Sequence, residues 1–261
     1  MNGIKFGLMI TIFALLGSVP LTAGEAVRRE QALIVFAASS LTDVLTAQSN
    51  AWASATGNIK PKLAFGASAT MARQIQSGAP ANLFISANPI WTQSLVDAGR
   101  AQSATSLISN RLVLVVPANE SYLPPFKPSA AGFNELLKGR RLALADPVTA
   151  PAGQYAKSYL MAIDLWQNLE PRLAYAPNVR QALRLVEAGG IPAFVYESDA
   201  LASPKTHIAY TVPEGLSPPI LYQAAVIQPE NAAAHSFLNF LTGQTAVHIW
   251  EKHGFRRIAS N

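Results

Sequence analysis

The sequence predicts an α/β protein with mostly parallel sheets that are covered by helices. Short apolar runs rich in β-branched residues recur along the chain, as expected for strands buried on both faces. Stretches with helical spacing of apolar residues follow most of these runs. No repeat, low-complexity segment or linker-like composition interrupts this alternation between residues 30 and 258. Two lobes would therefore have to be joined by strands that cross between them.

The first predicted strand is an apolar run, 33–38, that ends in small residues. Ser39 or Ser40 is placed to cap the helix that follows it. Residues 121–131, which are rich in proline and polar side chains, are predicted to form a loop. The other elements expected in this half are strands 62–65, 83–86, 111–116 and 141–145, and helices 69–76, 89–98 and 133–138.

The second half repeats the pattern. Asn178 is placed as the N-cap of one of its helices. The expected elements are helices 154–163, 179–188, 232–241 and 245–252, and strands 173–175, 191–196 and 221–227. This order of strands and helices again favours parallel pairing.

Residues 1–23 are expected to be a signal peptide. Lys5 supplies a positive start, residues 6–19 form an apolar core, and small residues up to Ala23 offer a cleavage site. A single transmembrane anchor is the alternative, but the segment is short and is broken by Gly17 and Pro20. Cleavage near Ala23 predicts export to the periplasm.

The composition excludes several classes of site. The chain has no cysteine, which rules out a lipid-modified cysteine, thiolate metal sites and cysteine nucleophiles. The net charge is +5, but Lys and Arg are dispersed, so no nucleic-acid interface is expected. The four histidines form no HxH or HxxxH pair, so no direct metal-cation site is expected either.

Four junctions between a strand and the next helix consist of small, uncharged residues. In open α/β sheets ligands bind at the carboxyl ends of strands. Helix starts carry unpaired N–H groups and partial positive charge, so they can hold an anion without a cationic side chain. Each junction alone is typical of an ordinary helix cap, but together they favour an oxyanion site. The junctions are 38–40, 66–70, 147–153 and 177–179.

Tyr196 and the segment 66–70 each allow two interpretations. Tyr196 ends a predicted strand and could direct its phenol into the same cleft, or it could be a buried core tyrosine. The segment 66–70 also fits the setting of a nucleophile elbow, with Ser68 as nucleophile and Asp199 and His235 as partners. Against this hydrolase, the last elbow position is Thr70 instead of glycine, and the other junctions would have no role.

Between residues 35 and 255 the sequence resembles the periplasmic molybdate-binding proteins that supply ABC importers. The most specific motifs are FAASSLTDVL (36–45), FGASATMARQIQSGAPANLFISAN (65–88), DPVTAPAGQYAK (146–157), NVRQALRLVEAGGIPAFVYESDA (178–200) and HGF (253–255).

The resemblance implies a two-lobed type II periplasmic-binding-protein fold with the ligand in the interlobe cleft. One lobe would contain residues 31–113 plus 220–258, and the other residues 114–219. The ligand would be molybdate or tungstate, without a further cofactor or an enzymatic activity. The expected partners are an ABC permease and its ATPase at the inner membrane, with the protein as a periplasmic monomer.

The resemblance also implies a ligand shell of uncharged donors. Two serines would bind through hydroxyl and backbone N–H, two small residues through backbone N–H, and a tyrosine through its phenol. The matching residues are Ser40, Ser68, Ala152, Val179 and Tyr196. Glu197 departs from the glycine that often follows the tyrosine, so its carboxylate is expected to point away from a bound dianion.

This donor set suits a fully deprotonated oxyanion. Molybdate carries no proton at neutral pH and needs donors only, whereas phosphate keeps a proton and would favour a carboxylate acceptor. A cage sized for long metal–oxygen bonds would hold sulfate too loosely, and tungstate is nearly isosteric with molybdate. A binding protein for sulfate or another small solute remains the alternative.

Overall fold

The computed structural model describes residues 32–120 and 126–258. The expected signal peptide, 1–23, with its cleavage site and part of the expected loop 121–131 lie outside the described residues.

The first of two five-stranded sheets has the strand order β2-β1-β3-β10-β4. Strand β1 pairs in parallel with β2 and β3, whereas β10 runs antiparallel to β3 and β4. The strands are β1 (Ile34–Ala38), β2 (Lys62–Gly66), β3 (Leu83–Ser86), β4 (Thr105–Asn110) and β10 (Ile220–Val226).

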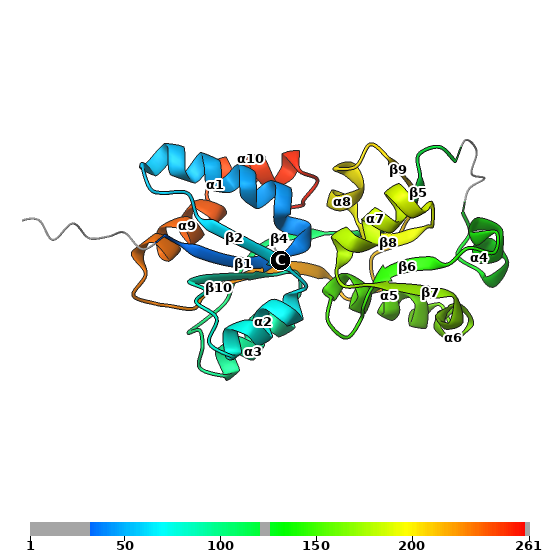
Figure 1. Ribbon diagram of the computed structural model, residues 1–261, viewed down its shortest axis with the longest axis horizontal. Coiled ribbons are helices and arrows are strands. Elements are labelled where there is room, and N and C mark those ends of the chain that lie inside the picture. Colours follow the sequence, from blue (N-terminus) through cyan, green and yellow to red (C-terminus); the bar gives the residue numbers. More distant parts are fainter. Residues whose placement is uncertain (1–31, 121–125, 259–261) are drawn as a thin grey trace, which may run out of the picture. The chain divides into compact units, whose positions relative to one another are not determined.

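Helices cover both faces of this first sheet (Figure 1). One face carries α1 (Thr42–Thr56), α9 (Ala232–Thr242) and α10 (Gln244–Lys252), and the short 3-10 helix η1 (Ser39–Leu41) leads into α1. The other face carries α2 (Ser68–Gln76) and α3 (Pro89–Asp97).

The second sheet has the order β7-β6-β8-β5-β9. Strand β6 is parallel to β7 and β8, and β5 is antiparallel to β8 and β9. The strands are β5 (Leu112–Pro117), β6 (Leu142–Ala145), β7 (Leu173–Ala176), β8 (Ala193–Tyr196) and β9 (Thr206–Thr211). The helices around it are α4 (Ala130–Leu137), α5 (Pro151–Ala162), α6 (Trp166–Leu169), η2 (Glu170–Arg172), α7 (Val179–Gly189) and α8 (Glu197–Leu201).

The chain passes between the sheets twice. Only Arg111 separates β4 from β5, and residues 212–219 connect β9 to β10. The strands that follow these crossings, β5 and β10, are antiparallel to the parallel strands at the centre of their sheets. Both sheets are therefore mixed, with more antiparallel pairing than the alternation of strands and helices predicts.

Four of the predicted strands that lie inside the sheets are buried on both faces. Every residue of β3, β5, β6 and β8 is buried, which explains why their sequences are continuous apolar runs. The sequence does not predict strands β4 and β9, because both consist largely of polar, partly exposed residues. Helix α5 begins at Pro151, earlier than predicted, since proline fits the first turn.

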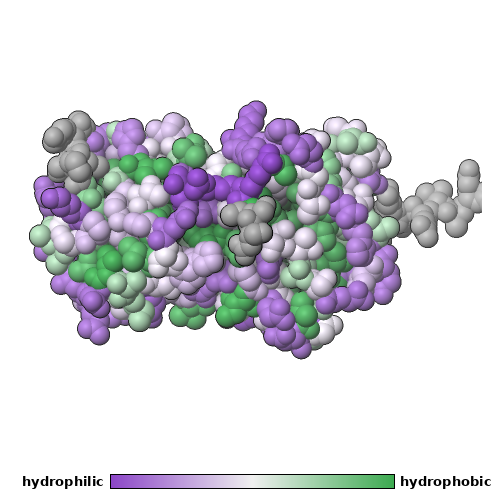
Figure 2. Space-filling view, turned by 180° about the vertical axis from the view of Figure 1, so that it is seen from behind, coloured by the Kyte–Doolittle hydropathy of each residue, from purple (hydrophilic) through white to green (hydrophobic). Residues whose placement is uncertain are grey.

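On the face opposite to the one seen in Figure 1, hydrophobic residues do not gather in one large patch. Figure 2 shows hydrophobic residues there as separate groups among hydrophilic ones. Across the part of the chain that the structure describes, no helix has the length and apolar character needed to cross a membrane.

Candidate ligand-binding site

One small cavity between the two sheets is lined by all five residues expected to hold the ligand. Ser40 and Ser68 reach it from the first sheet, at the carboxyl ends of β1 and β2. Ala152, Val179 and Tyr196 reach it from the second sheet, at the carboxyl ends of β6, β7 and β8. Five strand ends therefore converge on one point, which is where an open α/β sheet binds its ligand.

Helix starts supply the backbone donors of this cavity. Ser68 and Val179 are the first residues of α2 and α7, Ala152 is the second residue of α5, and Ser40 lies in η1. The first N–H groups of a helix have no acceptor inside the helix. These N–H groups and their partial positive charge can therefore bind an anion.

Neither Ser39 nor Ser40 caps the helix that follows, contrary to the prediction, and Ser68 does not cap α2. The position before η1 is Ala38 and the position before α2 is Ala67, and neither makes a side-chain cap. Ser40 and Ser68 instead lie inside η1 and α2, and the Ser40 hydroxyl contacts the buried Tyr222.

The capping prediction for α7 is confirmed. Asn178 Oδ1 accepts a hydrogen bond from Gln181 N at 3.1 Å. This cap fixes the start of α7 and, with it, the position of the Val179 N–H at the cavity.

Gly153 allows α5 to begin close to the end of β6. A Cβ atom at this position would lie 1.9 Å from the carbonyl oxygen of Ala145, a distance that no side chain can occupy. The glycine therefore permits the backbone approach that brings the neighbouring Ala152 to the cavity.

Tyr196 provides a buried donor without a partner. Its side chain is almost completely buried, and its hydroxyl has no hydrogen-bond partner. Burial raises the pKa of the phenol well above its usual value, so the group keeps its proton. A buried, unpaired hydroxyl is costly, and an acceptor bound in the cavity would satisfy it.

Both serine hydroxyls are buried, and each can still donate. Ser68 Oγ accepts from Ala87 N at 3.2 Å, which leaves its own proton free. Ser40 Oγ lies 2.8 Å from the Tyr222 hydroxyl, and either oxygen can be the donor. When Tyr222 donates, the Ser40 proton is also available to a ligand.

Hydrogen bonds join the elements of the two sheets beside the cavity. Ala69 N donates to Thr149 O at 3.2 Å. Tyr155 donates through its hydroxyl to Ala87 O, also at 3.2 Å. These bonds hold the donors from both sides around one space.

No charged side chain lines this cavity. Arg180 follows Val179, but its guanidinium lies 2.7 Å from Asp43 Oδ2 and 2.6 Å from Asp199 Oδ1. Burial raises the pKa of Asp199 to about 6, against the opposing effect of Arg180. The cation is thus balanced by carboxylates, and the cavity itself offers neutral donors.

Glu197 points away from the cavity, as expected. Its carboxylate pairs with the guanidinium of Arg111 at the crossing between β4 and β5, with an Nε–Oε2 distance of 2.9 Å. Glu197 does not line the small cavity, although Tyr196 beside it does.

The residues of the hydrolase alternative do not form a triad. His235 Nε2 lies 2.9 Å from the Pro229 carbonyl oxygen, and Asp199 lies beside Arg180. Ser68 is bonded to the Ala87 N–H. Within residues 32–120 and 126–258 there is also no group of His, Cys, Asp or Glu that could hold a metal ion.

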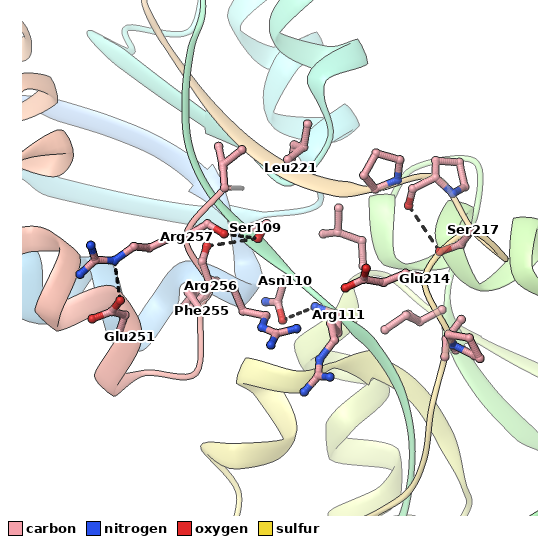
Figure 3. Close-up of a pocket in the computed structure, with 18 residues that line it drawn as sticks. Ser109, Asn110, Arg111, Glu214, Ser217, Leu221, Glu251, Phe255, Arg256 and Arg257 are labelled. Carbon is pink, nitrogen blue, oxygen red and sulfur yellow. Dashed lines mark hydrogen bonds and ion pairs between the residues drawn. The ribbon is translucent and has the colours of Figure 1, made fainter. Parts of the chain in front are cut away.

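A larger cavity of about 830 Å³ lies beside the two crossings and is shown in Figure 3. Two of its arginines are already paired, Arg111 with Glu197 and Arg257 with Glu251. Glu214 adds a further carboxylate to its wall. None of the buried, unpartnered polar atoms found among the described residues belongs to it. The small cavity is therefore the better oxyanion site.

Sequence reasoning missed Tyr222 and the pairing of Arg180. Tyr222 belongs to β10, and its contact with Ser40 joins residues that are 182 positions apart. Arg180 likewise meets Asp43 from a distant helix. No local pattern signals either contact. The first depends on how η1 meets β10 within the first sheet, and the second on how the two sheets pack.

Comparison with known proteins finds relatives among solute-binding proteins and molybdate-binding proteins. Residues 33–256 match the family of bacterial extracellular solute-binding proteins. The chain is 38% identical over 237 residues to the molybdate-binding protein ModA of Escherichia coli K12, covering 89% of this chain and 92% of that protein. It is 32% identical over 225 residues to ModA of Haemophilus influenzae, covering 85% and 88%. The solved Azotobacter vinelandii periplasmic molybdate-binding protein superposes with a TM-score of 0.75 at 25% identity, covering 88% of this chain and 100% of that one.

Proposed function

The chain belongs to the bacterial extracellular solute-binding proteins, and we propose that it is the component of an ABC importer that captures molybdate or tungstate. The observation that carries this proposal is the convergence of uncharged donors from both sheets on one cavity, including the unpaired, buried hydroxyl of Tyr196. The ModA relatives, at 38% and 32% identity, support the same ligand class.

The proposed ligand shell contains donors only. Ser40 and Ser68 would bind through hydroxyl and backbone N–H, Ala152 and Val179 through backbone N–H, and Tyr196 through its hydroxyl. Each hydrogen bond to a charged oxyanion contributes about 1.5–3 kcal/mol. Four or five of them suit a sub-micromolar dissociation constant once the costs of ordering and closure are subtracted.

The proposed lobes are residues 31–113 plus 220–258 and residues 114–219. Each of these ranges contains the larger part of one sheet, which supports the division. The first boundary falls inside β5, so we place the hinge at Arg111, between β4 and β5. The second boundary coincides with the start of β10 at Ile220.

The remaining parts of the proposal concern the cellular setting. The protein would be exported by a signal peptide cleaved near Ala23, act as a periplasmic monomer and deliver its ligand to a permease and its ATPase. It would need no cofactor and would catalyse no reaction. Labelling of Ser68 by a fluorophosphonate probe would contradict this last expectation.

Isothermal titration calorimetry with molybdate, tungstate, sulfate and phosphate tests the ligand. Binding of the first two, with much weaker binding of sulfate and phosphate, is expected. Ser94→Ala is the control for serine variants of the site. The Ser94 hydroxyl donates to Trp91 O on α3 and does not line the cavity, so this variant should bind like the wild type. A preference for sulfate would overturn the choice of ligand.

A crystal soaked in molybdate gives an independent test. Anomalous scattering from molybdenum should locate the metal between Ser40, Ser68 and Tyr196. A peak in the larger cavity beside Arg111 instead would move the site there.

A further inference from the structure

Arg180 forms ion pairs with carboxylates from both sides of the cavity. It is the second residue of α7, which packs on the second sheet. Asp199, 2.6 Å away, belongs to α8 on the same sheet, whereas Asp43, 2.7 Å away, belongs to α1 on the first sheet. The Arg180–Asp43 pair therefore connects the two sheets.

This pair lies at the edge of the candidate site. Val179, which precedes Arg180, lines the cavity, and so does Ser40, three residues before Asp43. The Arg180 guanidinium also donates to the Ser40 carbonyl oxygen over 3.5 Å. Any separation of the two sheets here would pull Asp43 and Ser40 away from Arg180 and Val179 together.

The two carboxylates are in different environments. The Asp199 side chain is completely buried, whereas that of Asp43 is 49% exposed. Water can therefore replace Arg180 as the partner of Asp43, and this pair can open without unfolding. The pair with Asp199 lies within one sheet and its helices, so it can hold Arg180 in place while the other pair opens.

We propose that Arg180 is a positioning residue that holds the two sheets together around the ligand through Asp43, so that this ion pair slows ligand release. The proposal rests on the proposed function, because it takes molybdate or tungstate as the enclosed ligand. A ligand bound by donors from both sheets leaves only when they separate. A contact present only in the closed arrangement acts on the dissociation rate more than on the association rate.

Asp43 is the residue to change. Replacing Arg180 would leave Asp199 as a buried, unpaired carboxylate and could unfold the protein. Asp43→Asn removes one carboxylate and keeps the Arg180–Asp199 pair. Asp43→Glu keeps the charge, and Glu251→Gln is a matched control that breaks an ion pair with Arg257 away from the cavity.

The test measures the dissociation rate of radioactive molybdate from the full mature protein during a chase with excess unlabelled tungstate. Asp43→Asn should release the ligand about two- to fivefold faster, the range expected for a partly exposed ion pair. Asp43→Glu should restore slow release, and Glu251→Gln should match the wild type. High salt should reduce the difference between wild type and Asp43→Asn, because it screens the pair.

The association and dissociation rates must be measured separately, because the Asp43 carboxylate also repels an approaching anion. Loss of this repulsion would raise the association rate of Asp43→Asn without affecting the proposal. Release from Asp43→Asn at or below the wild-type rate would overturn the proposal and leave the proposed function intact. A wild-type protein that binds neither oxyanion would overturn the proposed function itself.

Discussion

The hydroxyl oxygens of Ser40 and Tyr222 lie 2.8 Å apart in the protein interior, where a residue from η1 meets one from β10. If Tyr222 donates in this contact, it orients the Ser40 oxygen and leaves the serine proton for the ligand. Tyr222 does not line the cavity, so its effect on the ligand would pass through Ser40.

Tyr222→Phe should therefore weaken oxyanion binding by about 0.5–1.5 kcal/mol, less than removal of the serine hydroxyl itself. Calorimetry on Tyr222→Phe, Ser40→Ala and the double variant measures the coupling. The double variant should bind about as weakly as Ser40→Ala alone. Fully additive losses would show that Tyr222 acts independently of Ser40.

Removal of either serine hydroxyl should weaken binding while the protein remains folded. Ser40→Ala and Ser68→Ala should each cost about 1–3 kcal/mol of binding free energy, because each removes one donor to a charged ligand. The measurement is titration with molybdate, with circular dichroism to verify folding. Unchanged affinity in both variants would remove these serines from the site.

The Tyr196 hydroxyl should affect binding and stability in opposite directions. Tyr196→Phe removes a donor to the ligand, so affinity should fall by about 1–3 kcal/mol. The same change removes a buried hydroxyl without a partner, so the free energy of unfolding of the ligand-free protein should stay the same or rise.

Tyr155→Phe is the matched comparison for this prediction. The Tyr155 hydroxyl donates to Ala87 O at 3.2 Å, so its removal should lower the free energy of unfolding by about 0.5–1.5 kcal/mol. Urea denaturation of both variants without ligand makes the comparison. An equal loss of stability in the two would mean that the Tyr196 hydroxyl has a partner in solution.

Parts of this arrangement could be predicted from sequence for physical reasons. Strands such as β3 and β5 are buried on both faces, so burial demands the apolar runs that reveal them. The junctions at Ser68 and Ala152 require small residues, because backbone and ligand must come close together. Both features depend on neighbouring residues only, so they are visible in the local sequence.

Other parts could not be predicted because they depend on contacts between distant segments. Strand β4 is an edge strand with polar, partly exposed residues, and nothing local distinguishes it from a loop. The contact of Ser40 with Tyr222 arises only when the strands of the first sheet assemble, and that of Arg180 with Asp43 only when the two sheets pack. The expected serine cap was wrong, because Ala38 occupies the capping position.

Gly153→Ala should reduce both stability and affinity. The new Cβ would lie 1.9 Å from the Ala145 carbonyl oxygen, and that contact is with backbone, so α5 would have to shift. Overpacking of this kind costs about 1–3 kcal/mol, and the shift would displace the Ala152 N–H.

Gly189→Ala provides the control. A Cβ at Gly189, in the last turn of α7, would meet no atom within 4 Å. Alanine also favours helix over glycine, so stability should be unchanged or slightly higher. Thermal denaturation and molybdate titration of both variants test the prediction, and equal behaviour of the two would contradict it.

Asp199 should make stability depend on pH in the direction opposite to that of a surface ion pair. Burial raises its pKa from 3.8 to about 6 in the folded protein. The folded state therefore holds the Asp199 proton more tightly than the unfolded state does. Its contribution to stability is fully present below about pH 4 and is lost as the pH rises through the folded pKa of about 6.

The comparison with Asp199→Asn isolates this effect, because asparagine does not titrate. Between pH 4 and 7 the free energy of unfolding of the wild type should fall relative to that of Asp199→Asn by about 2 kcal/mol, from urea denaturation at each pH. Glu251→Gln is a control of opposite sign, since Arg257 lowers the pKa of Glu251 and that contribution is lost as the pH falls. Parallel pH profiles for wild type and Asp199→Asn would show that Arg180 keeps Asp199 ionised throughout.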